Sequence, residues 1–319
     1  MRTARLGSRG PELSVIGFGA WEVGGSDFLG PAPPRDQMVE AVRAALDAGI
    51  DWIDTAEVYG DGASEEVVAL AIQGRRDDVL IATKVAPAPE GSGFRPPEVR
   101  RACTDSLRRL RTGHIDLYQL HWPDEDDIPL EDTWGAMGAL VEEGLVRWIG
   151  LSNFDREQIE PCEAVRHVDS LQQEFSMLVL HDRELIRWCG EQGIGVLAYG
   201  PLAYGLLTGA ISAETGFDPK DFRSGYDEWD YWQRLFAPGR FERSLAVVDA
   251  LRPIAERLGV TPGQLALAWS VRQPGVTSAI AGSRNPEHVR SNAAAGEVEL
   301  DEPAMAELEA ILSLGPAFA

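Results

Sequence analysis

The sequence predicts a barrel of eight parallel β-strands surrounded by α-helices, the (β/α)8 or TIM-barrel class of α/β proteins. Three observations carry this prediction. About eight short apolar runs recur along the chain, amphipathic helical patterns lie between them, and no Pro- or Ser-rich linker divides the 319 residues. Alternating strands and helices indicate a parallel sheet with right-handed crossovers, and eight units favour a closed barrel over an open doubly wound sheet. We therefore expect residues 1–319 to form a single domain.

The predicted strands are short apolar runs bounded by Gly, Pro, Asp or Asn, the residues typical of turns. They are Val15–Gly19, Trp52–Asp54, Val79–Thr83, Ile115–Leu120, Trp148–Leu151, Ser170–Glu174, Gly195–Tyr199 and Thr277–Ile280.

Helical patterns fill the intervals between these strands. Arg35–Ala48 carries apolar residues at helical spacing and stops at Gly49, the residue type favoured just past a helix end. Pro96 and Pro97 open the next long helix, and two more are predicted over Leu130–Glu143 and Asp182–Glu191.

Two segments lie outside the repeat. Arg2–Leu13 is predicted as a hairpin that turns at Ser8-Arg9-Gly10 and closes the bottom of the barrel. Leu202–Arg243, after the seventh strand, is too long for an ordinary loop, and loops of such length are usually lids or binding elements. Its aromatic residues either supply apolar contacts to a substrate or fasten the insertion to the barrel rim; they are Phe222, Tyr226, Trp229, Tyr231, Trp232 and Phe236.

Composition narrows the classes of function. A hydrophobic fraction of 44% and a charged fraction of 25% are those of a globular protein. A net charge of −22 argues against nucleic acid or an anionic membrane as partner, because such surfaces demand clustered Lys and Arg. The three cysteines are far apart and outside any metal-ligand spacing, and the N-terminus has no apolar core region typical of a signal peptide. We expect a cytoplasmic protein with reduced thiols.

Reactive residues follow three consecutive predicted strands. Asp54 ends the second strand and Tyr59 lies in the loop after it, Lys84 follows the third strand, and His121 follows the fourth. The carboxyl ends of barrel strands form the active-site rim, so these four side chains are expected to converge. In this arrangement Tyr59 is the proton donor, and the Lys84 ammonium would lower the pKa of its phenol. Asp54 would hold Lys84, and His121 would donate a hydrogen bond to a substrate carbonyl.

The chain resembles the aldo-keto reductase superfamily over nearly its whole length. The resemblance rests on an ordered set of motifs: Gly17-Phe18-Gly19-Ala20-Trp21, Ile53-Asp54-Thr55-Ala56-Glu57-Val58-Tyr59-Gly60, Ile81-Ala82-Thr83-Lys84, Leu117-Tyr118-Gln119-Leu120-His121-Trp122-Pro123, Ile149-Gly150-Leu151-Ser152-Asn153-Phe154, Gln172-Gln173-Glu174-Phe175-Ser176, Tyr199-Gly200-Pro201-Leu202 and Ile280-Ala281-Gly282-Ser283-Arg284. It implies that Asp54, Tyr59, Lys84 and His121 are a catalytic tetrad of an NADP(H)-dependent enzyme that reduces aldehydes or ketones, or oxidises the corresponding alcohols.

The resemblance also implies a set of cofactor contacts. Ser152, Asn153 and Gln172 match residues that hydrogen-bond the nicotinamide amide, and Tyr199 matches the ring that stacks on the nicotinamide. Pro201, Leu202 and Gly205 fall where the family's loop passes over the pyrophosphate. Ser283, Arg284 and the helix expected over Asn285–Asn292 resemble the site for the 2′-phosphate and adenine, because a helix N-terminus beside an arginine binds anions well.

The adenosine-phosphate motif departs from the family pattern at three positions. Many members carry Lys in place of Gly282, Arg in place of His288, and an acidic residue in place of Ser291. Each of these changes weakens a contact to the phosphate or the adenine. Arg284 and the helix start still favour NADP(H), and NAD(H) is the alternative. A neutral His288 predicts tighter binding at lower pH.

The substrate pocket is expected to be lined by aromatic groups and no metal is required. Trp21 and Trp122 flank the tetrad by position, and with Tyr59 and His121 they form the predicted pocket. The acidic run 124–127 is expected to be a solvated loop, because no second ligand cluster accompanies it.

Three other functions remain open at this stage. They are an NAD-linked alcohol or sugar dehydrogenase on the same scaffold, a nicotinamide-sensing regulatory subunit with little turnover, and a non-redox barrel enzyme that binds a sugar phosphate.

Overall fold

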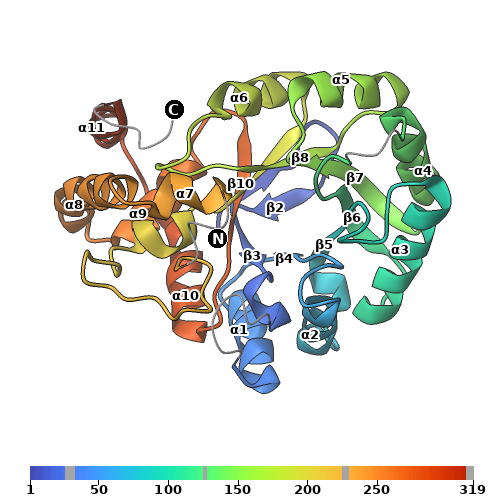
Figure 1. Ribbon diagram of the computed structural model, residues 1–319, viewed down its shortest axis with the longest axis horizontal. Helices are drawn as coiled ribbons and strands as arrows, with labels where there is room; N and C mark the ends of the chain where they lie inside the picture. The colour runs from blue at the N-terminus through green and yellow to red at the C-terminus, as the bar shows by residue number, and fades with distance from the viewer. Residues whose placement is uncertain (26–32, 125–127, 225–229, 314–319) are drawn as a thin grey trace.

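Eight parallel strands close into a barrel in this computed structural model, which describes residues 1–25, 33–124, 128–224 and 230–313 (Figure 1). Neighbours in the barrel are neighbours in the chain, and β10 closes the ring by pairing with β3 and β9. The strands are β3 (Ile16–Gly19), β4 (Trp52–Asp54), β5 (Leu80–Val85), β6 (Ile115–Leu120), β7 (Val146–Ser152), β8 (Ser170–Glu174), β9 (Gly195–Tyr199) and β10 (Val276–Ala281). The predicted fold class is confirmed, and each predicted strand overlaps an observed one.

Helices surround the barrel and cover the outward faces of its strands (Figure 1). Among the described residues they are α1 (Arg35–Asp47), α2 (Ala63–Ala71), α3 (Pro96–Leu110), α4 (Leu130–Glu142), α5 (Arg156–Val165), α6 (Arg183–Gln192), α7 (Asp230–Phe236), α8 (Arg240–Leu258), α9 (Pro262–Ser270), α10 (Pro286–Ala294) and α11 (Glu302–Ser313). Short 3₁₀ turns add η1 (Glu22–Gly24), η2 (Arg76–Asp78), η3 (Ala203–Thr208) and η4 (Ala295–Glu297). No helix of the described residues is long and apolar enough to cross a membrane.

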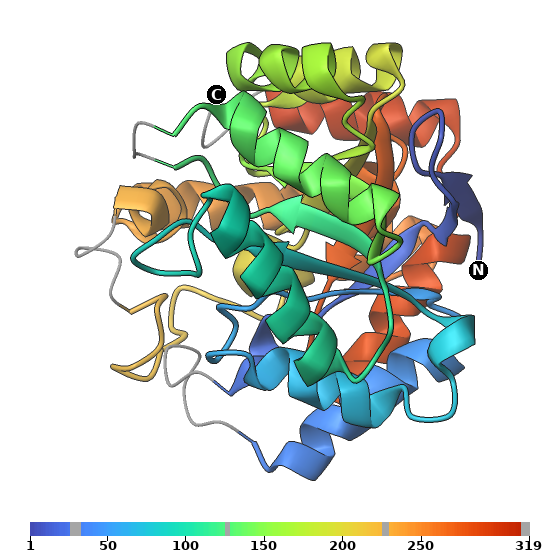
Figure 2. The same ribbon diagram turned by 90° about the vertical axis from the view of Figure 1, so that its right-hand side faces the viewer.

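An antiparallel hairpin of β1 (Thr3–Arg5) and β2 (Glu12–Ser14) closes the end of the barrel where the strands begin. Leu6 and Leu13 from this hairpin are buried in one cluster with Trp52, Leu117 and other side chains of the barrel interior. Their burial removes apolar surface from water at both the hairpin and the barrel floor. The predicted closure is therefore present, and Figure 2 shows the hairpin and the insertion at opposite ends of the barrel.

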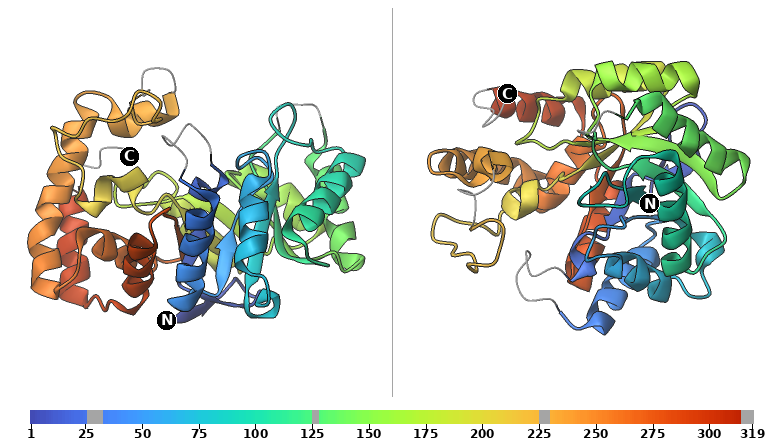
Figure 3. Two further views of the ribbon diagram at one scale, coloured as in Figure 1. Left: turned by 90° about the horizontal axis from the view of Figure 1, so that it is seen from below. Right: turned by 45° about the vertical axis from the view of Figure 1, so that its right-hand side comes forward.

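The insertion after β9 contains more regular structure than predicted. It holds η3 and α7, and α8 already begins at Arg240, inside the range Leu202–Arg243 that the sequence assigned to the insertion. Gly239, with a φ of 80°, turns the chain at the start of α8, and Glu242 accepts a hydrogen bond from its backbone N–H. Figure 3 places this segment at the end of the barrel opposite the N-terminus.

Candidate active site

A buried ion pair lies at the carboxyl end of the barrel. The Lys84 ammonium from β5 donates to Asp54 Oδ2 at 2.7 Å and to the Thr55 carbonyl oxygen at 2.9 Å. The Lys84 side chain is fully buried and that of Asp54 is 5% exposed. A buried ammonium is stable only where charge and hydrogen bonds compensate its lost hydration, and Asp54 provides both.

The pair continues into two further side chains. Lys84 Nζ lies 3.3 Å from the Tyr59 hydroxyl, and that hydroxyl lies 3.4 Å from His121 Nε2. The four residues therefore form one hydrogen-bonded chain, Asp54–Lys84–Tyr59–His121, as their positions at consecutive strand ends predict. Lys84 lies one residue before the end of β5, because that strand runs to Val85.

The pKa of the Tyr59 phenol results from opposing effects. Burial raises this pKa above its ordinary value; Lys84 lowers it, as expected from the sequence, and Asp54 raises it further. The effect of burial exceeds that of Lys84, and the sequence does not reveal how deeply the hydroxyl is buried. The phenol keeps its proton at neutral pH.

The two basic members of the chain differ in charge. Burial favours the neutral form of Lys84, but Asp54 and Tyr59 outweigh it and the pKa of Lys84 is raised. Burial and the nearby Lys84 charge place the pKa of His121 well below its ordinary value. Lys84 is therefore a cation and His121 a neutral imidazole at neutral pH. His121 Nδ1 is buried and has no hydrogen-bond partner among the described residues.

Three residues that the resemblance implies as nicotinamide contacts make hydrogen bonds that hold the tetrad residues Asp54 and His121 in place. Gln172 Nε2 donates to Asp54 Oδ1 at 2.7 Å, so Gln172 and Lys84 bind different oxygens of the same carboxylate. Asn153 donates to the His121 carbonyl oxygen at 2.9 Å and accepts a hydrogen bond from the Tyr199 hydroxyl at 2.8 Å. Sequence reasoning missed these supporting bonds, because they join β4, β7, β8 and β9 across the barrel mouth. Ser152 is buried, and its hydroxyl accepts a hydrogen bond from Asn153 Nδ2 at 3.2 Å.

The loop after β9 turns sharply over the barrel mouth. Ala203, Tyr204 and Gly205 have φ values of 47°, 55° and 98°, three consecutive residues with positive φ. The Ala203 and Gly205 N–H groups donate within this turn, to the Gly200 and Leu202 carbonyl oxygens. Pro201 is buried and Leu202 is partly buried at the start of this loop.

Gly282 lies where two strands come unusually close. A Cβ at this position would meet the Gly19 carbonyl oxygen at 2.3 Å, well inside van der Waals contact. The resemblance suggested that a lysine had been lost at position 282. The structure gives a local steric reason for glycine there, because a side chain on residue 282 would collide with the end of β3.

The start of α10 carries the predicted phosphate site. Asn285 caps the helix by accepting from the Glu287 N–H, and Ser283 accepts from the Asn285 N–H. Arg284 is half-buried and lies 3.9 Å from the Glu22 carboxylate, measured from Arg284 Nε to Glu22 Oε2. His288 is exposed on the first turns of α10, and Asn292 is partly buried further along. Glu22 was not predicted as a site residue, although an acidic residue directly after Trp21 in the first rim loop was the available signal.

Aromatic side chains surround the mouth of the barrel. The Trp122 ring lies 4.5 Å from that of His121, and Trp21 packs against Phe222 of the insertion at 5.7 Å. Phe222 and Phe236 are buried; Phe222 fastens the insertion to Trp21 of the rim, and Phe236 packs against Phe222 and against Phe241 of α8. Tyr226 and Trp229 lie outside the described residues, as do the side chains of Tyr231 and Trp232 and residues 125–127 of the acidic run. Within the described ranges no group of three His, Cys, Asp or Glu side chains is placed to hold a metal ion.

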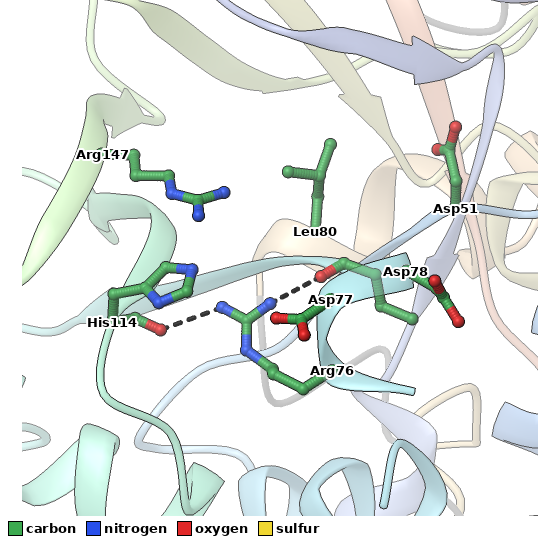
Figure 4. A pocket seen from close by; sticks show the side chains of 8 residues that line it. Asp51, Arg76, Asp77, Asp78, Leu80, His114 and Arg147 are labelled. Atoms are coloured by element: carbon green, nitrogen blue, oxygen red, sulfur yellow. Dashed lines mark hydrogen bonds between the residues drawn. The ribbon is translucent and has the colours of Figure 1, made fainter. Parts of the chain in front are cut away.

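The opposite end of the barrel contains a cavity of about 300 Å³ (Figure 4). Arg76, His114 and Arg147 line one side of it, and Asp51, Asp77 and Asp78 line the other. This cavity lies at the amino ends of the strands, whereas active sites of (β/α)8 barrels lie at the carboxyl ends. Its arginines are engaged by the buried Asp116, at 2.7 Å from Arg76 and 2.8 Å from Arg147.

Comparison with known proteins identifies the family of the chain. Residues 15–313 match the model of the aldo/keto reductase family. The chain is 37% identical to the aldo-keto reductase YhdN of Bacillus subtilis, over 90% of this chain and 86% of the relative. It superposes on the glycerol dehydrogenase AKR11B4 of Gluconobacter oxydans with a TM-score of 0.87 and 32% identity, covering 98% of this chain and 96% of the other. An aldo/keto reductase of Klebsiella pneumoniae in complex with NADP and acetate gives a TM-score of 0.75 at 34% identity, covering 99% and 96% of the two chains. The chain belongs to the aldo/keto reductase family of oxidoreductases.

Proposed function

We propose that this protein is an NADP(H)-dependent reductase that converts aldehydes or ketones to alcohols, or catalyses the reverse reaction, with Tyr59 as general acid. The observation that carries the proposal is the hydrogen-bonded chain Asp54–Lys84–Tyr59–His121 at the carboxyl end of the barrel. A proton donor, a cation that stabilises its conjugate base and a neutral imidazole beside it are the groups that protonation of a carbonyl oxygen needs.

The protein's own part in the reaction is the transfer of one proton. A reduced nicotinamide, when bound, supplies a hydride to the carbonyl carbon of the substrate. Tyr59 donates its phenolic proton to the carbonyl oxygen, which yields the alcohol and leaves a phenolate. Lys84 stabilises that phenolate, Asp54 holds Lys84, and neutral His121 hydrogen-bonds the substrate oxygen. In the alcohol-oxidising direction Tyr59 accepts the proton instead.

The rim fits a dinucleotide. Tyr199 ends β9, is only partly buried and has its hydroxyl fixed by Asn153, so its ring is held for stacking on a nicotinamide. Ser152, Asn153 and Gln172 would hold the carboxamide. The turn at Ala203–Gly205, beside Pro201 and Leu202, would lie against the pyrophosphate. Ser283, Arg284, His288 and Asn292 would receive the adenosine 2′-phosphate and adenine, and Gly282 would contribute its backbone directly before them. The NADP complex of the Klebsiella pneumoniae relative supports this choice of cofactor.

The substrate is a small carbonyl compound or alcohol bound among aromatic rings. Trp122 packs beside His121, Trp21 packs against Phe222 of the insertion, and both rings would line the proposed pocket with Tyr59 and His121. A polyol is the second candidate substrate, because the similar structure from Gluconobacter oxydans is a glycerol dehydrogenase.

The proposal is tested in two steps. First, tryptophan fluorescence is followed during titration with NADPH and with NADH. Next, an aromatic aldehyde or a ketone is added with the reduced cofactor, and glycerol is added separately with the oxidised cofactor. The absorbance of the reduced nicotinamide measures turnover in both cases. Binding with turnover supports the proposal. Binding of nicotinamide without turnover on the whole panel favours a regulatory subunit, and a protein that binds neither cofactor contradicts the assigned site.

A further inference from the structure

A carboxylate already occupies the place where the cofactor's extra phosphate is expected. Glu22 lies in η1, directly after Trp21, and its Oε2 is 3.9 Å from Arg284 Nε. Arg284 directly precedes Asn285, the N-cap residue of α10, so this carboxylate lies near the start of that helix. Arg223 from the insertion and His288 from α10 are the other cationic groups that act on Glu22.

The groups that hold Glu22 are those that would hold a phosphate. A guanidinium, an N–H at the start of a helix and an imidazole together form an anion site. The site has limited capacity, because Arg223 is also engaged by Asp221, at 2.6 Å. A phosphate dianion arriving here has to displace the Glu22 carboxylate or remain close to it, and both processes cost free energy. A ribose 2′-hydroxyl carries no charge and meets no such repulsion; it can even donate a hydrogen bond to a carboxylate.

We propose that Glu22 is a specificity-determining residue that competes with the 2′-phosphate for Arg284 and so lowers the preference of this protein for NADPH over NADH. The inference rests on the proposed function, since it assigns the adenosine phosphate to the start of α10. Arg284 attracts the phosphate in this arrangement, and the intramolecular acid Glu22 opposes that attraction.

The competition depends on pH. Burial raises the pKa of Glu22, and Arg284, Arg223 and His288 oppose that rise without reversing it. Protonation of Glu22 as the pH falls removes the charge that competes with phosphate for Arg284, so NADPH binding tightens at lower pH. The part of the pH dependence due to Glu22 disappears in a Glu22 variant.

The test compares three proteins by tryptophan fluorescence titration with NADPH and NADH: the wild type, Glu22→Gln and the control Glu160→Gln. Glu160 is a half-exposed carboxylate paired with Arg156 on α5, on the other side of the barrel from α10 (Figure 1). We expect Glu22→Gln to bind NADPH about tenfold more tightly, with NADH affinity changed less than about threefold. Glu160→Gln should change neither affinity.

A double-mutant cycle sharpens the assignment. In an Arg284→Ala background, Glu22→Gln should lose most of its effect on NADPH, because the group for which carboxylate and phosphate compete is gone. An unchanged NADPH-to-NADH ratio in Glu22→Gln, or an equal gain in Glu160→Gln, would overturn the inference and leave the proposed function intact. A wild-type protein that binds neither nucleotide would overturn the proposed function and the inference with it.

Discussion

The two ends of the barrel each contain a buried carboxylate that is neutralised by cations, and the two sites are organised differently. At the amino end, Asp116 is 2% exposed and accepts from Arg76, Arg147 and the backbone N–H of Ile81, so the arginines are bound mainly to fixed acceptors. At the carboxyl end, Lys84 is fully buried and makes a third hydrogen bond to the Tyr59 hydroxyl. That hydroxyl carries a proton that can leave.

This difference separates a structural ion cluster from a reactive one. The Asp116 cluster ends in carbonyl oxygens, a threonine and solvent-exposed arginine atoms. The Lys84 chain ends in a phenol and a neutral imidazole at the open mouth of the barrel. We therefore expect substitutions at the two ends to separate activity from stability.

The largest expected effect is on turnover at the rim. Tyr59→Phe removes the phenolic proton and leaves the ring, so turnover should fall about 10²–10⁴-fold while cofactor affinity is retained. Single-turnover kinetics with an aldehyde and a parallel NADPH titration measure the two quantities. Turnover equal to that of the wild type would show that the proton comes from another group.

The second effect is on stability at the amino end. Asp116→Asn leaves Arg76 and Arg147 without their buried countercharge and should lower the free energy of unfolding by about 2–4 kcal/mol, with turnover unchanged. Urea unfolding measures this loss. Asp47→Asn is the matched control, because Asp47 pairs with Arg75 at 2.7 Å on the surface, where such a pair contributes about 0–1 kcal/mol. Equal losses in the two variants would remove the distinction between the buried cluster and a surface pair.

The smallest effect is a pH dependence carried by one histidine at each end. The pKa of His121 is well below its ordinary value because of burial, so the unfolded chain binds a proton at a pH where the folded protein does not. The stability that neutral His121 contributes is therefore present above a pH of about 6.5 and is lost at up to about 1.4 kcal/mol per unit as the pH falls. Urea unfolding between about pH 7 and pH 5 should show a shallower loss in His121→Asn than in the wild type.

His114 provides the comparison at the amino end. Burial and Arg76 lower its pKa as well, but its side chain is 26% exposed and Asp116 opposes the shift. His114→Asn should therefore flatten the pH dependence less than His121→Asn does. The reverse order would mean that the imidazole at the amino end is the more strongly desolvated one.

Much of the fold was predictable because each barrel strand has a recognisable local sequence pattern. Each is a short apolar run between turn residues, and the residues that follow them, such as Asp54 and His121, meet at one rim by topology alone. Helix α9 was missed because it is buried on nearly all sides, so it has no polar face and no amphipathic period. The insertion follows β9 as predicted, but α8 begins inside its predicted range, and α7 was not predicted, since its packing depends on distant contacts such as the Glu174–Arg234 ion pair.

The site was predictable in its members and less so in their couplings. The four residues of the tetrad come together as expected, yet the bond from Gln172 to Asp54 joins residues 118 positions apart and leaves no local pattern. The pKa direction of Tyr59 depends on depth of burial, which is a property of the whole rim. Glu22 was not predicted because its proposed role depends on its contact with Arg284. Arg284 is distant in the sequence and meets Glu22 only where β3 and β10 are neighbours.

The tight approach of β10 to β3 has a consequence for redesign of cofactor preference. A lysine introduced at position 282 would force its Cβ against the Gly19 carbonyl oxygen, 2.3 Å away, so β3 would have to move before the new charge could act. Attempts to engineer this scaffold toward NADPH should therefore leave Gly282 unchanged and replace Glu22. That substitution changes the charge of the site without requiring the backbone to move.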